Sequence, residues 1–452
     1  MHLTPKTSIL CYGVKKMRKL IIVFMAVLFL TACTAEAEAF QETSHAPEKE
    51  HHAFFSVSRV EFKSDAESDV GLEEESKASE SMKAIWVSQF DMKPLYRNGT
   101  KQREEADYRS RVEAMTANLA RDGFNTVFLQ VRPNGDSMYE SEFYPLSRYV
   151  AGSYGGSISY DAIEIYLEIA KKNGISVHAW INPFRLCEEG ELKNAFGRLK
   201  EWSADIGGRI KLGSNGVYYL DPSYEEATEL IVDGATEILE KYDFDGIHID
   251  DYFYPTEFEL DDEAEFKSSG YTDKGEFRRD NVSRTVKALY DAVHGFEGKV
   301  FGISPAGNIT SLPKKWYADI YVWLENDGYT DYILPQLYFG FENAVCPFER
   351  TLEKWEAAVK NENITLYIGL SAAKCAIGSK GGEDKYAGEA GKYEWRDNKD
   401  ILVRSLEAIN SSSADGVCIF TYSSFYSTTT GERNSLTLEE ATSFIELLKK
   451  SE

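Results

Sequence analysis

The sequence predicts an α/β fold, a (β/α)8 TIM barrel, and three observations lead to this prediction. From residue 82 onward, short apolar stretches typical of strands alternate with stretches typical of helices. This alternation indicates a parallel sheet covered by helices. Eight apolar stretches can be counted, which is the number that closes such a sheet into a barrel. Polar or aromatic residues also stand at the ends of most of these stretches, where barrel enzymes carry their sites.

The strands are expected, in chain order, at residues 84–90, 126–132, 176–182, 247–250, 300–304, 332–338, 365–371 and 417–422. The helices are expected at residues 103–121, 161–172, 224–242, 280–293, 348–360, 401–410 and 438–449. Gly123 ends the first helix and Asn173-Gly174 ends the second, as expected for helix C-termini. The long connection after the third strand is expected to hold a small excursion from the barrel.

Aspartate recurs near the start of three predicted strands, as Asp245, Asp331 and Asp415. The N-terminal ends of barrel strands lie at the face opposite the usual site. We interpret the recurrence as a feature of that face, and not as a true repeat.

One predicted strand carries the strongest chemical signal. Residues 245–255 read D-G-I-H-I-D-D-Y-F-Y-P. Ile247 and Ile249 fall on one face, and His248 and Asp250 fall on the other. The strand ends in two adjacent carboxylates and three aromatic rings, and a proline then stops regular structure. Carboxylates perform acid–base chemistry and flat rings stack on sugars, so we interpret this as the active-site strand of a barrel that cleaves a glycan.

The alternation of side chains predicts which residues point into the barrel. Successive side chains in a strand point to opposite faces, so the apolar residues that face the helices identify the inward ones. The inward residues expected near the strand ends are Gln130, Arg132, His178, Trp180, Asn182, His248, Asp250, Ser304, Gln336, Tyr338, Ser371 and Tyr422. A purely structural core does not need so many polar and aromatic strand ends. We therefore expect them to line a pocket.

Asp250 is the first candidate for a catalytic carboxylate, because its position points it at this pocket. Asp251 could take this catalytic role in place of Asp250. An equal alternative is that Asp251 is a loop carboxylate that pairs with an arginine. Glycoside hydrolysis usually needs two carboxyl groups. Candidates for the second are Asp136 and Glu140 after the second strand and Glu325 before the sixth. The sequence leaves this choice open.

Substrate contacts are expected from the hydrogen-bonding and aromatic residues at the same strand ends. Arg132 suits a carboxylate or an acidic sugar, with an internal ion pair to Asp250 as the alternative. The other candidates are Trp180, Asn182, Arg185, His248, Tyr252, Gln336, Tyr338 and Tyr422. His248 is also open to interpretation as a hydrogen-bonded core histidine. Packing can explain any single ring, but the cluster of rings favours sugar.

Charge and cysteine content exclude several classes of protein. The 452 residues carry a formal net charge of −24, so no nucleic-acid partner is expected. Beyond the N-terminal region the cysteines are Cys187, Cys346, Cys375 and Cys418, widely separated and without C-x-x-C pairs. This spacing predicts neither a zinc site nor a disulfide framework. We expect no metal and no cofactor, and the oligomeric state stays open.

The N-terminal residues 1–33 are typical of a bacterial lipoprotein signal peptide. A basic run precedes the apolar stretch 20–30, and L-T-A-C ends at Cys33, which resembles a lipobox cysteine. An ordinary signal peptide with a coincidental cysteine is the alternative. Residues 34–80 are rich in Glu, Ser and Ala and are expected to form a flexible acidic tether. A catalytic domain is expected at 81–452, on a protein secreted across the cytoplasmic membrane and anchored through lipidated Cys33 as a cell-envelope lipoprotein.

The chain resembles the glycosyl hydrolase-like 10 family of bacterial envelope proteins. The matching stretches, in family order between residues 84 and 371, are FNTVFLQVRPNGDSMYES, HAWINPFR, YYLDPS, YDFDGIHIDDYFYP, FRRDNV, FGISPAGN, YADIYVW, DYILPQLYFG and LYIGLSA. The resemblance implies a (β/α)8 barrel and a glycosidase, with peptidoglycan glycan strands as the expected substrate. It does not identify the catalytic pair. The sequence departs from the commonest family pattern at Asp221 and at Ala306-Gly307-Asn308, which concerns substrate detail rather than the fold.

The leading hypothesis is a lipid-anchored glycoside hydrolase of an envelope polysaccharide, and two alternatives stay open. One is a non-catalytic glycan-binding lipoprotein. The other is a metal-dependent polysaccharide deacetylase using His248, Asp250 and Asp251, whose alternating directions make a poor ligand set. The fourth strand also resembles the chitinase signature D-G-x-D-x-D-x-E. Here His248 and Tyr252 replace two of its acids, so the chitinase mechanism is not carried over.

Overall fold

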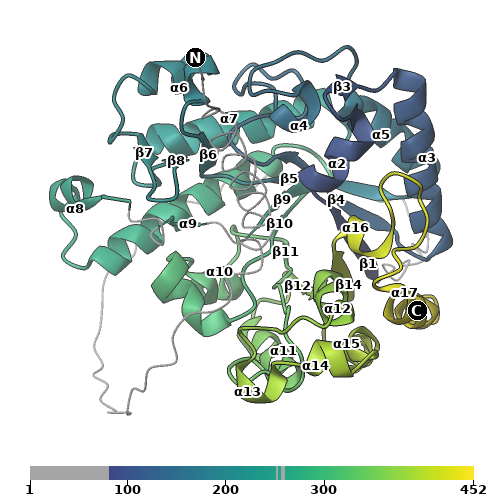
Figure 1. Cartoon of the computed structure of the whole chain (residues 1–452). Coiled ribbons are helices and arrows are strands. Elements are labelled where there is room, and N and C mark those ends of the chain that lie inside the picture. Colours follow the sequence, from purple (N-terminus) through teal and green to yellow (C-terminus); the bar gives the residue numbers. More distant parts are fainter. Residues whose placement is uncertain (1–80, 251–252, 256–259, 452) are drawn as a thin grey trace, which may run out of the picture. The chain divides into compact units, whose positions relative to one another are not determined.

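The computed structural model describes residues 81–250, 253–255 and 260–451 (Figure 1). Within these ranges one parallel sheet has the order β12-β11-β10-β9-β5-β4-β1-β14-β13. Its strands are β1 (Met82–Val87), β4 (Thr126–Arg132), β5 (Ser176–Ile181), β9 (Gly246–Ile249), β10 (Val300–Ile303), β11 (Tyr332–Ile333), β12 (Thr365–Leu366), β13 (Ile368–Ser371) and β14 (Gly416–Phe420). Only Tyr367 separates β12 from β13, so both edges belong to one stretch of chain. The sheet therefore closes on itself, and the predicted (β/α)8 barrel is confirmed.

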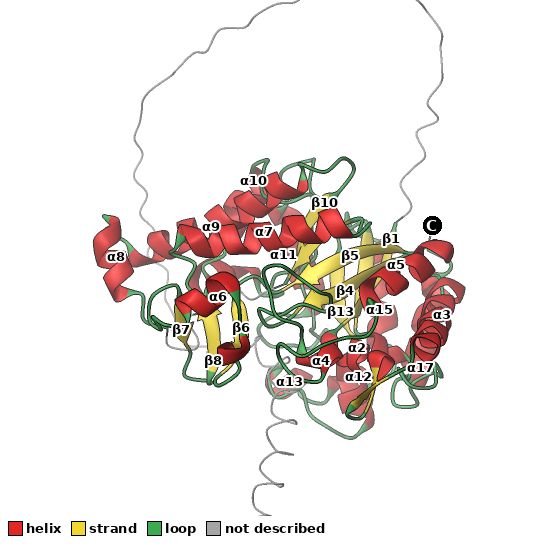
Figure 2. Cartoon of the chain, turned by 90° about the horizontal axis from the view of Figure 1, so that it is seen from above, coloured by secondary structure: helices red, strands yellow, loops and turns green. Residues whose placement is uncertain are grey.

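Helices cover the outside of this sheet (Figure 2). The long ones are α3 (Glu105–Arg121), α5 (Ala162–Lys172), α7 (Glu225–Lys241), α9 (Lys274–Val293), α11 (Phe348–Ala358), α15 (Ile401–Asn410) and α17 (Leu438–Leu448). All seven predicted helices are present. Shorter helices are α2 (Gln89–Tyr96), α4 (Arg148–Ala151), α6 (Gly197–Trp202), α8 (Glu263–Ser269), α10 (Ile320–Glu325), α12 (Ala372–Ser379), α13 (Gly388–Gly391), α14 (Glu394–Asp397) and α16 (Tyr422–Phe425).

Two predicted strands end well before their predicted last residue, the first at Val87 and the sixth at Ile333. The first ends at Val87 because Ser88 starts α2, where its amide and hydroxyl both donate to the Asp91 carboxylate, at 2.8 and 2.7 Å. The sixth is reduced to Tyr332–Ile333. Pro335 follows within two residues and has no N–H to give to a ladder.

The expected excursion is a small antiparallel sheet between β5 and α7. Its strands are β6 (Arg185–Glu188), β7 (Ile210–Leu212) and β8 (Val217–Leu220), in the order β6-β8-β7. Figure 1 shows this sheet beside the barrel, next to α6 and α7.

The barrel interior is mostly aromatic and holds two buried histidines. The indole N–H of Trp86 donates to Nε2 of His248 over 3.2 Å. The Tyr332 hydroxyl lies 3.1 Å from Nδ1 of His248 and 3.0 Å from Nδ1 of His178. An indole N–H can only donate, so neutral His248 carries its proton on Nδ1 and donates it to Tyr332. The proton of the Tyr332 hydroxyl has Nδ1 of His178 as its acceptor when His178 carries its own proton on Nε2, and the hydrogen bonds then run in one direction.

Side chains just before three strands bind the neighbouring strand at the N-terminal face. The contacts are Asn125 with the Lys83 amide (2.9 Å), Asp245 with the Val177 amide (2.7 Å) and Asp331 with the Phe301 amide (2.6 Å). In each case the amide belongs to the second residue of the neighbouring strand. Asp415 takes part through its backbone carbonyl, which accepts the Met82 amide. Asp245 and Asp331 thus share a side-chain contact at the N-terminal face, where we expected the recurrence to act, whereas Asp415 binds Met82 through its backbone carbonyl.

We expect Asp245→Ala to lower the free energy of unfolding by about 1–3 kcal/mol, because the Val177 amide loses its partner. Urea unfolding followed by circular dichroism measures the change. The matched control is Asp243→Ala, whose side chain is 65% exposed in ion pairs with Lys171 and Lys299. Exposed pairs contribute about 0–1 kcal/mol each. Equal losses in the two variants would contradict the structural role of Asp245.

The predicted signal peptide, Cys33 and the tether at 34–80 lie outside the described residues. Among the residues that the structure does describe, no helix is both long enough and apolar enough to span a membrane.

Candidate active site

A chain of hydrogen bonds across β4, β5 and β9 ends on Asp250, at the C-terminal end of the barrel. The side-chain nitrogen of Asn182 donates to both carboxylate oxygens of Asp250, at 2.6 and 2.7 Å. The Asn182 oxygen accepts from Nε2 of Gln130 at 2.7 Å, and Oε1 of Gln130 accepts the Gln89 backbone amide at 2.9 Å. Asp250 itself is 3% exposed. The sequence predicted that Gln130, Asn182 and Asp250 face inward, and the structure brings them into contact.

A second polar pair continues this row on the next strands. The Gln336 side-chain nitrogen donates to the Ser304 carbonyl at 3.2 Å and to its hydroxyl at 3.4 Å. The Ser304 amide donates to the Ile249 carbonyl at 2.7 Å, which places the pair beside Asp250. Because β4, β5, β9, β10 and β11 are neighbours in that order, the five residues form a continuous row. We call this row the polar arc: Gln130, Asn182, Asp250, Ser304 and Gln336.

An aromatic pair lies on other strand ends of the same face. The rings of Tyr338 and Phe420 have centroids 5.9 Å apart, and Phe420 lies 6.1 Å from Trp86 in the barrel interior. Gln336 and Phe420 are only partly buried. Hydrogen-bonding groups and aromatic faces at one end of the barrel are the combination that sugar binding uses.

Arg132 does not face this end of the barrel, contrary to the prediction. The pairing of β4 with β5 shifts between Gln130, which pairs with Trp180, and Arg132, which pairs with Ile181. Such a bulge inserts one residue and changes which way the following side chain points. The buried guanidinium lies over the Tyr144 ring, 4.5 Å from its centroid, and toward α7. The alternative that we considered, an ion pair with Asp250, is wrong for the same reason.

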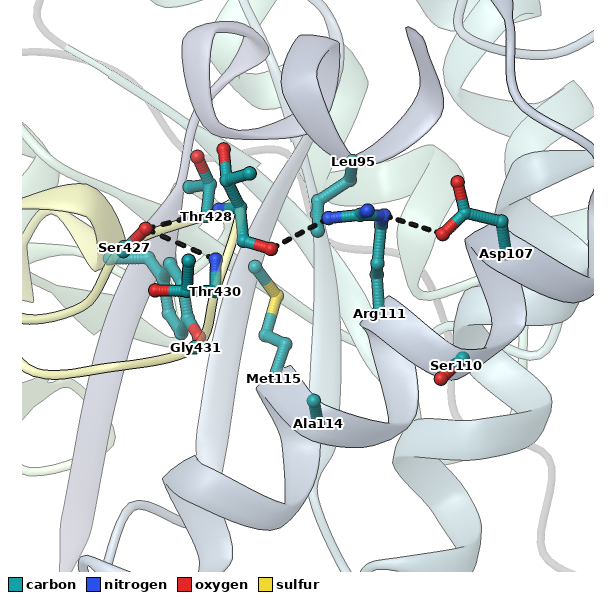
Figure 3. Close-up of a pocket in the computed structure, with 12 residues that line it drawn as sticks. Leu95, Asp107, Ser110, Arg111, Ala114, Met115, Ser427, Thr428, Thr430 and Gly431 are labelled. Carbon is teal, nitrogen blue, oxygen red and sulfur yellow. Dashed lines mark hydrogen bonds and ion pairs between the residues drawn. The ribbon is translucent and has the colours of Figure 1, made fainter. Parts of the chain in front are cut away.

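Tyr422 is also misplaced by the prediction. β14 ends at Phe420 and Tyr422 starts α16, so the alternation of strand side chains no longer applies. Its ring stacks on Tyr426 at 4.9 Å. It borders a cavity of about 230 Å³ between α3 and residues 427–431, which Figure 3 shows. None of the described residues that line this cavity belongs to the polar arc.

Trp180 and His248 point into the barrel but lie in its packed interior. They are 2% and 0% exposed, and His248 stacks on Phe128 with centroids 4.1 Å apart. Burial lowers the pKa of His248 well below its ordinary range. The structure therefore supports the alternative interpretation of His248 as a hydrogen-bonded core histidine, with Trp180 packed in the same layer.

Asp136 and Arg185 lie in the two loops that follow β4 and β5. Asp136 is fully buried and accepts the Asn134 amide at 2.8 Å. Burial raises its pKa, against the opposing effect of its hydrogen bonds and of Arg148 and Arg185. A raised pKa suits a general acid, but a carboxyl without exposed surface cannot touch substrate in this conformation. Arg185 donates to the Pro133 carbonyl at 2.9 Å and so ties the two loops together.

Glu325 is not brought to the polar arc. Its side chain, at the end of α10, is 57% exposed and pairs with Lys360 at 3.2 Å. The carbonyl of Leu324 accepts the amides of Lys360 and Asn361, which lead into the N-terminal end of β12. Glu325 therefore lies toward the face opposite Asp250, and it is a poor candidate for the second carboxyl group.

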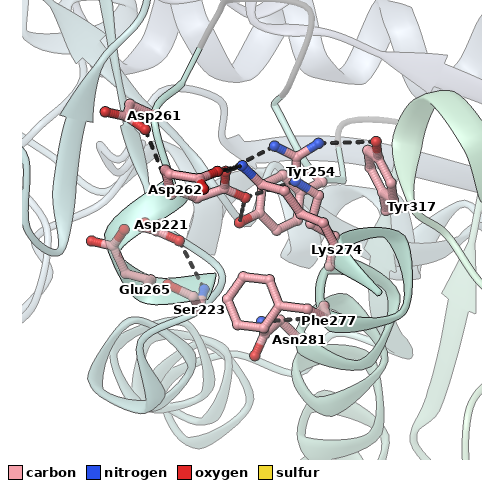
Figure 4. Close-up of polar contacts among 12 residues, drawn as sticks. Asp221, Ser223, Tyr254, Asp261, Asp262, Glu265, Lys274, Phe277, Asn281 and Tyr317 are labelled. Atoms are coloured by element: carbon pink, nitrogen blue, oxygen red, sulfur yellow. Dashed lines mark hydrogen bonds and ion pairs between the residues drawn. The ribbon is translucent and has the colours of Figure 1, made fainter. Parts of the chain in front are cut away.

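The candidates Asp251 and Tyr252 lie outside the described residues. The rings that follow them, Phe253 and Tyr254, are each 1% exposed and offer no open stacking surface. The Tyr254 hydroxyl donates to Asp262 at 2.8 Å, and Arg278 binds the same carboxylate with two hydrogen bonds of 2.7 and 2.8 Å. Figure 4 shows Tyr254 and Asp262 within this set of polar contacts. Tyr254 is thus held next to α9 through Asp262 and Arg278.

A small cavity beside these contacts shows how closely the rings are packed. It has a volume of about 10 Å³ and is lined by Phe184, Arg185, Tyr219, Phe253, Tyr254, Pro255 and Trp316. That volume holds about one water molecule. The open, ring-lined cleft expected from the sequence is not formed by these residues.

His248 is not available as a metal ligand for the deacetylase alternative, whose third residue, Asp251, lies outside the described residues. Both ring nitrogens of His248 are engaged, by Trp86 and by Tyr332, and Asp250 is bound by Asn182. In the described part of the chain, no group of three or more His, Cys, Asp or Glu side chains is placed to hold a metal ion. Cys187, Cys346, Cys375 and Cys418 are buried free thiols, as their spacing predicted.

Known proteins can now be compared with this barrel. Residues 81–387 match the glycosyl hydrolase-like 10 family. Glycosyl hydrolase DigH of Escherichia coli K12 is 28% identical over 334 residues, which is 67% of this chain and 76% of DigH. Glycosyl hydrolase YngK of Bacillus subtilis is 30% identical over 280 residues, 56% of this chain and 53% of YngK, so that match spans about half of YngK.

Among solved structures, the catalytic domain of a β-amylase from Paenibacillus polymyxa has the same type of fold. It superposes with a TM-score of 0.51 at 10% identity, over 82% of this chain and 98% of the amylase domain. The family match covers well over half of the chain, in the stretches that carried the resemblance. The chain therefore belongs to the glycosyl hydrolase-like 10 family, and its enzyme class is that of the glycoside hydrolases.

Proposed function

We propose that the protein hydrolyses the glycan strands of peptidoglycan, with Asp250 as a catalytic carboxylate. The observation that carries this proposal is the position of Asp250, held by Asn182 at the C-terminal end of β9, where barrel enzymes act. A carboxyl group there either protonates the leaving oxygen, or attacks the sugar or activates water as a carboxylate. Gln336, the partly buried member of the polar arc, and the Tyr338–Phe420 pair would hold the sugar rings.

An envelope glycan is proposed because the N-terminal sequence predicts export. The basic run, the apolar stretch 20–30 and Cys33 together direct a protein across the cytoplasmic membrane and attach a lipid to it. The acidic residues 34–80 would then let the barrel reach its substrate from the membrane surface. A net charge of −24 is consistent with a polysaccharide rather than a nucleic-acid partner.

The proposal is tested by incubating the purified protein with peptidoglycan sacculi, with and without their stem peptides. Mass spectrometry of the soluble fraction is expected to show sugar fragments that carry new reducing ends. Binding to sacculi without such fragments would contradict hydrolysis and favour a glycan-binding protein. Release of acetate without fragments would favour a deacetylase.

Cys33→Ser is expected to move the protein from the membrane fraction to the soluble fraction of the cells that express it. Serine has no thiol to which a lipid can be attached, so the mature protein should also lack the mass of the lipid. Fractionation and mass spectrometry of the intact protein measure both effects. A Cys33→Ser protein that stays in the membrane fraction would show that the lipobox does not anchor it.

A further inference from the structure

We propose that Gln130 is a positioning residue for Asp250, which acts by fixing the orientation of the Asn182 amide. The inference rests on the proposed function, because it is that function which makes Asp250 catalytic. Gln130 itself touches Asn182 and the Gln89 amide. Its effect on the reaction would therefore pass through Asn182.

The direction of every hydrogen bond in this chain follows from its first donor. The Gln89 backbone N–H, at the start of α2, can only donate, so the oxygen of Gln130 must face it. The NH2 group of Gln130 then faces Asn182, at 2.7 Å, and requires the oxygen of Asn182 there. The NH2 group of Asn182 is left to face Asp250, where it reaches both carboxylate oxygens.

The orientation matters because the two ends of an amide have opposite hydrogen-bonding character. If Asn182 turned over, its oxygen would lie about where its nitrogen now lies, 2.6 and 2.7 Å from the oxygens of Asp250. When a hydrogen-bond acceptor faces an ionised carboxylate and no proton lies between them, the charged form of the carboxylate is destabilised. Gln89, Gln130 and Asn182 are 2%, 0% and 1% exposed, so water has little access to compensate.

Gln130→Glu tests this inference with almost no change of shape. The second carboxylate oxygen of the new side chain would replace the NH2 group that faces Asn182. Asn182 would then turn over to donate to it, and its oxygen would face Asp250. Ionised Asp250 would lose the two hydrogen bonds from Asn182 and face an acceptor in their place, so the limb of the pH–activity profile that Asp250 sets should move to higher pH by about one unit or more. This direction is the same whether Asp250 works as an acid or as a base.

Gln102→Glu is the matched control. Gln102 is also a glutamine with both amide atoms hydrogen-bonded, to the Tyr96 hydroxyl and to Ser159. It lies in a separate hairpin, formed by β2 (Arg97–Asn98) and β3 (Lys101–Gln102). Its variant should keep the wild-type pH profile on sacculi. Gln130→Met removes the hydrogen bonds without adding a charge, and it should lower kcat about tenfold or more while KM stays within about twofold.

The outcomes separate this inference from the proposed function. Suppose that Asp250→Asn is inactive, while Gln130→Glu keeps the wild-type pH profile and Gln130→Met keeps the wild-type kcat. This combination would overturn the role of Gln130 and leave the proposed function standing. Full activity of Asp250→Asn would overturn the proposed function instead. If Gln130→Glu does not fold, as judged by thermal unfolding, the kcat and KM of Gln130→Met decide the question.

Discussion

Asp250→Asn is expected to lower the release of fragments from sacculi by about 10³-fold, because a carboxamide can neither give nor take the proton that the reaction moves. It cannot act as a carboxylate nucleophile either. The asparagine keeps the shape of the side chain, and its oxygen can still accept from Asn182. Binding of the protein to sacculi and its thermal unfolding should therefore change little. The rate of fragment release measures the effect.

The control for this variant is Asp291→Asn, which makes the same chemical change on α9. The Asp291 side chain is 61% exposed and pairs with Lys287 at 3.5 Å, so its loss should leave fragment release at the wild-type rate. Wild-type activity in Asp250→Asn would show that another carboxyl group performs the reaction. A loss shared by both variants would point to instability or to the change in net charge.

Local sequence signals were sufficient for most of the barrel. β4 has the predicted bounds 126–132, and α3 and α5 differ from the prediction by one or two residues at their starts. Apolar periodicity and the residues that end helices act within a few positions, and for this reason they can be read from one sequence. The helix α2 was missed although Ser88 and Asp91 form a capping box, a signal that could have revealed it.

The site was predicted only where the strands stay regular. Alternation of side chains correctly placed Asn182 and Asp250 at one end of the barrel. It failed at Arg132, where a bulge follows Gln130, and at Tyr422, where a helix has already begun. Bulges and helix starts depend on packing between neighbouring strands and loops, which the local pattern of one strand does not contain.

Phe253 and Tyr254 do not line an open cleft, for a similar reason. Phe253 and Tyr254 have the composition of a sugar platform, but contacts with residues far along the chain bury them. The Tyr254 hydroxyl binds Asp262, which Arg278 also holds. Such pairings are set by the fold as a whole, and composition cannot distinguish a packed ring from an exposed one.

Acidification from pH 6.5 to pH 4 is expected to lower the free energy of unfolding by roughly 3 kcal/mol through His178 alone. Burial lowers the pKa of this histidine to about 4. The unfolded chain binds a proton below about pH 6.5, the ordinary value for histidine, whereas the folded chain does not bind it until about pH 4. Protons are therefore taken up by the unfolded state across this window, and stability falls as the pH falls. Above pH 6.5 His178 is neutral in the folded and in the unfolded chain, so it has little effect on the pH dependence of stability.

His178→Asn separates this effect from the acid sensitivity of the carboxylates. The asparagine oxygen can stand near the place of Nδ1 and accept from the Tyr332 hydroxyl, but it does not titrate. Urea unfolding at pH 7, 5.5 and 4 should show a shallower loss of stability in the variant, by about 1.4 kcal/mol per pH unit. Ion-paired carboxylates affect stability at lower pH than His178 does. The lysine partners of Asp243, for example, lower its pKa to about 2, so the folded protein keeps this charge down to pH values below 4.

The remaining acid sensitivity of the variant should come largely from His248. Its Nε2 accepts the Trp86 indole N–H, so a proton added there would set two donors against each other inside the barrel. Burial holds the pKa of His248 well below its ordinary range, so its contribution to stability is also lost as the pH falls. Parallel loss of stability in wild type and His178→Asn between pH 6.5 and 4 would show that His178 does not contribute to it. Because His248 lies on β9, we expect the neutral forms of His178 and His248 to help keep β9, and with it Asp250, in place.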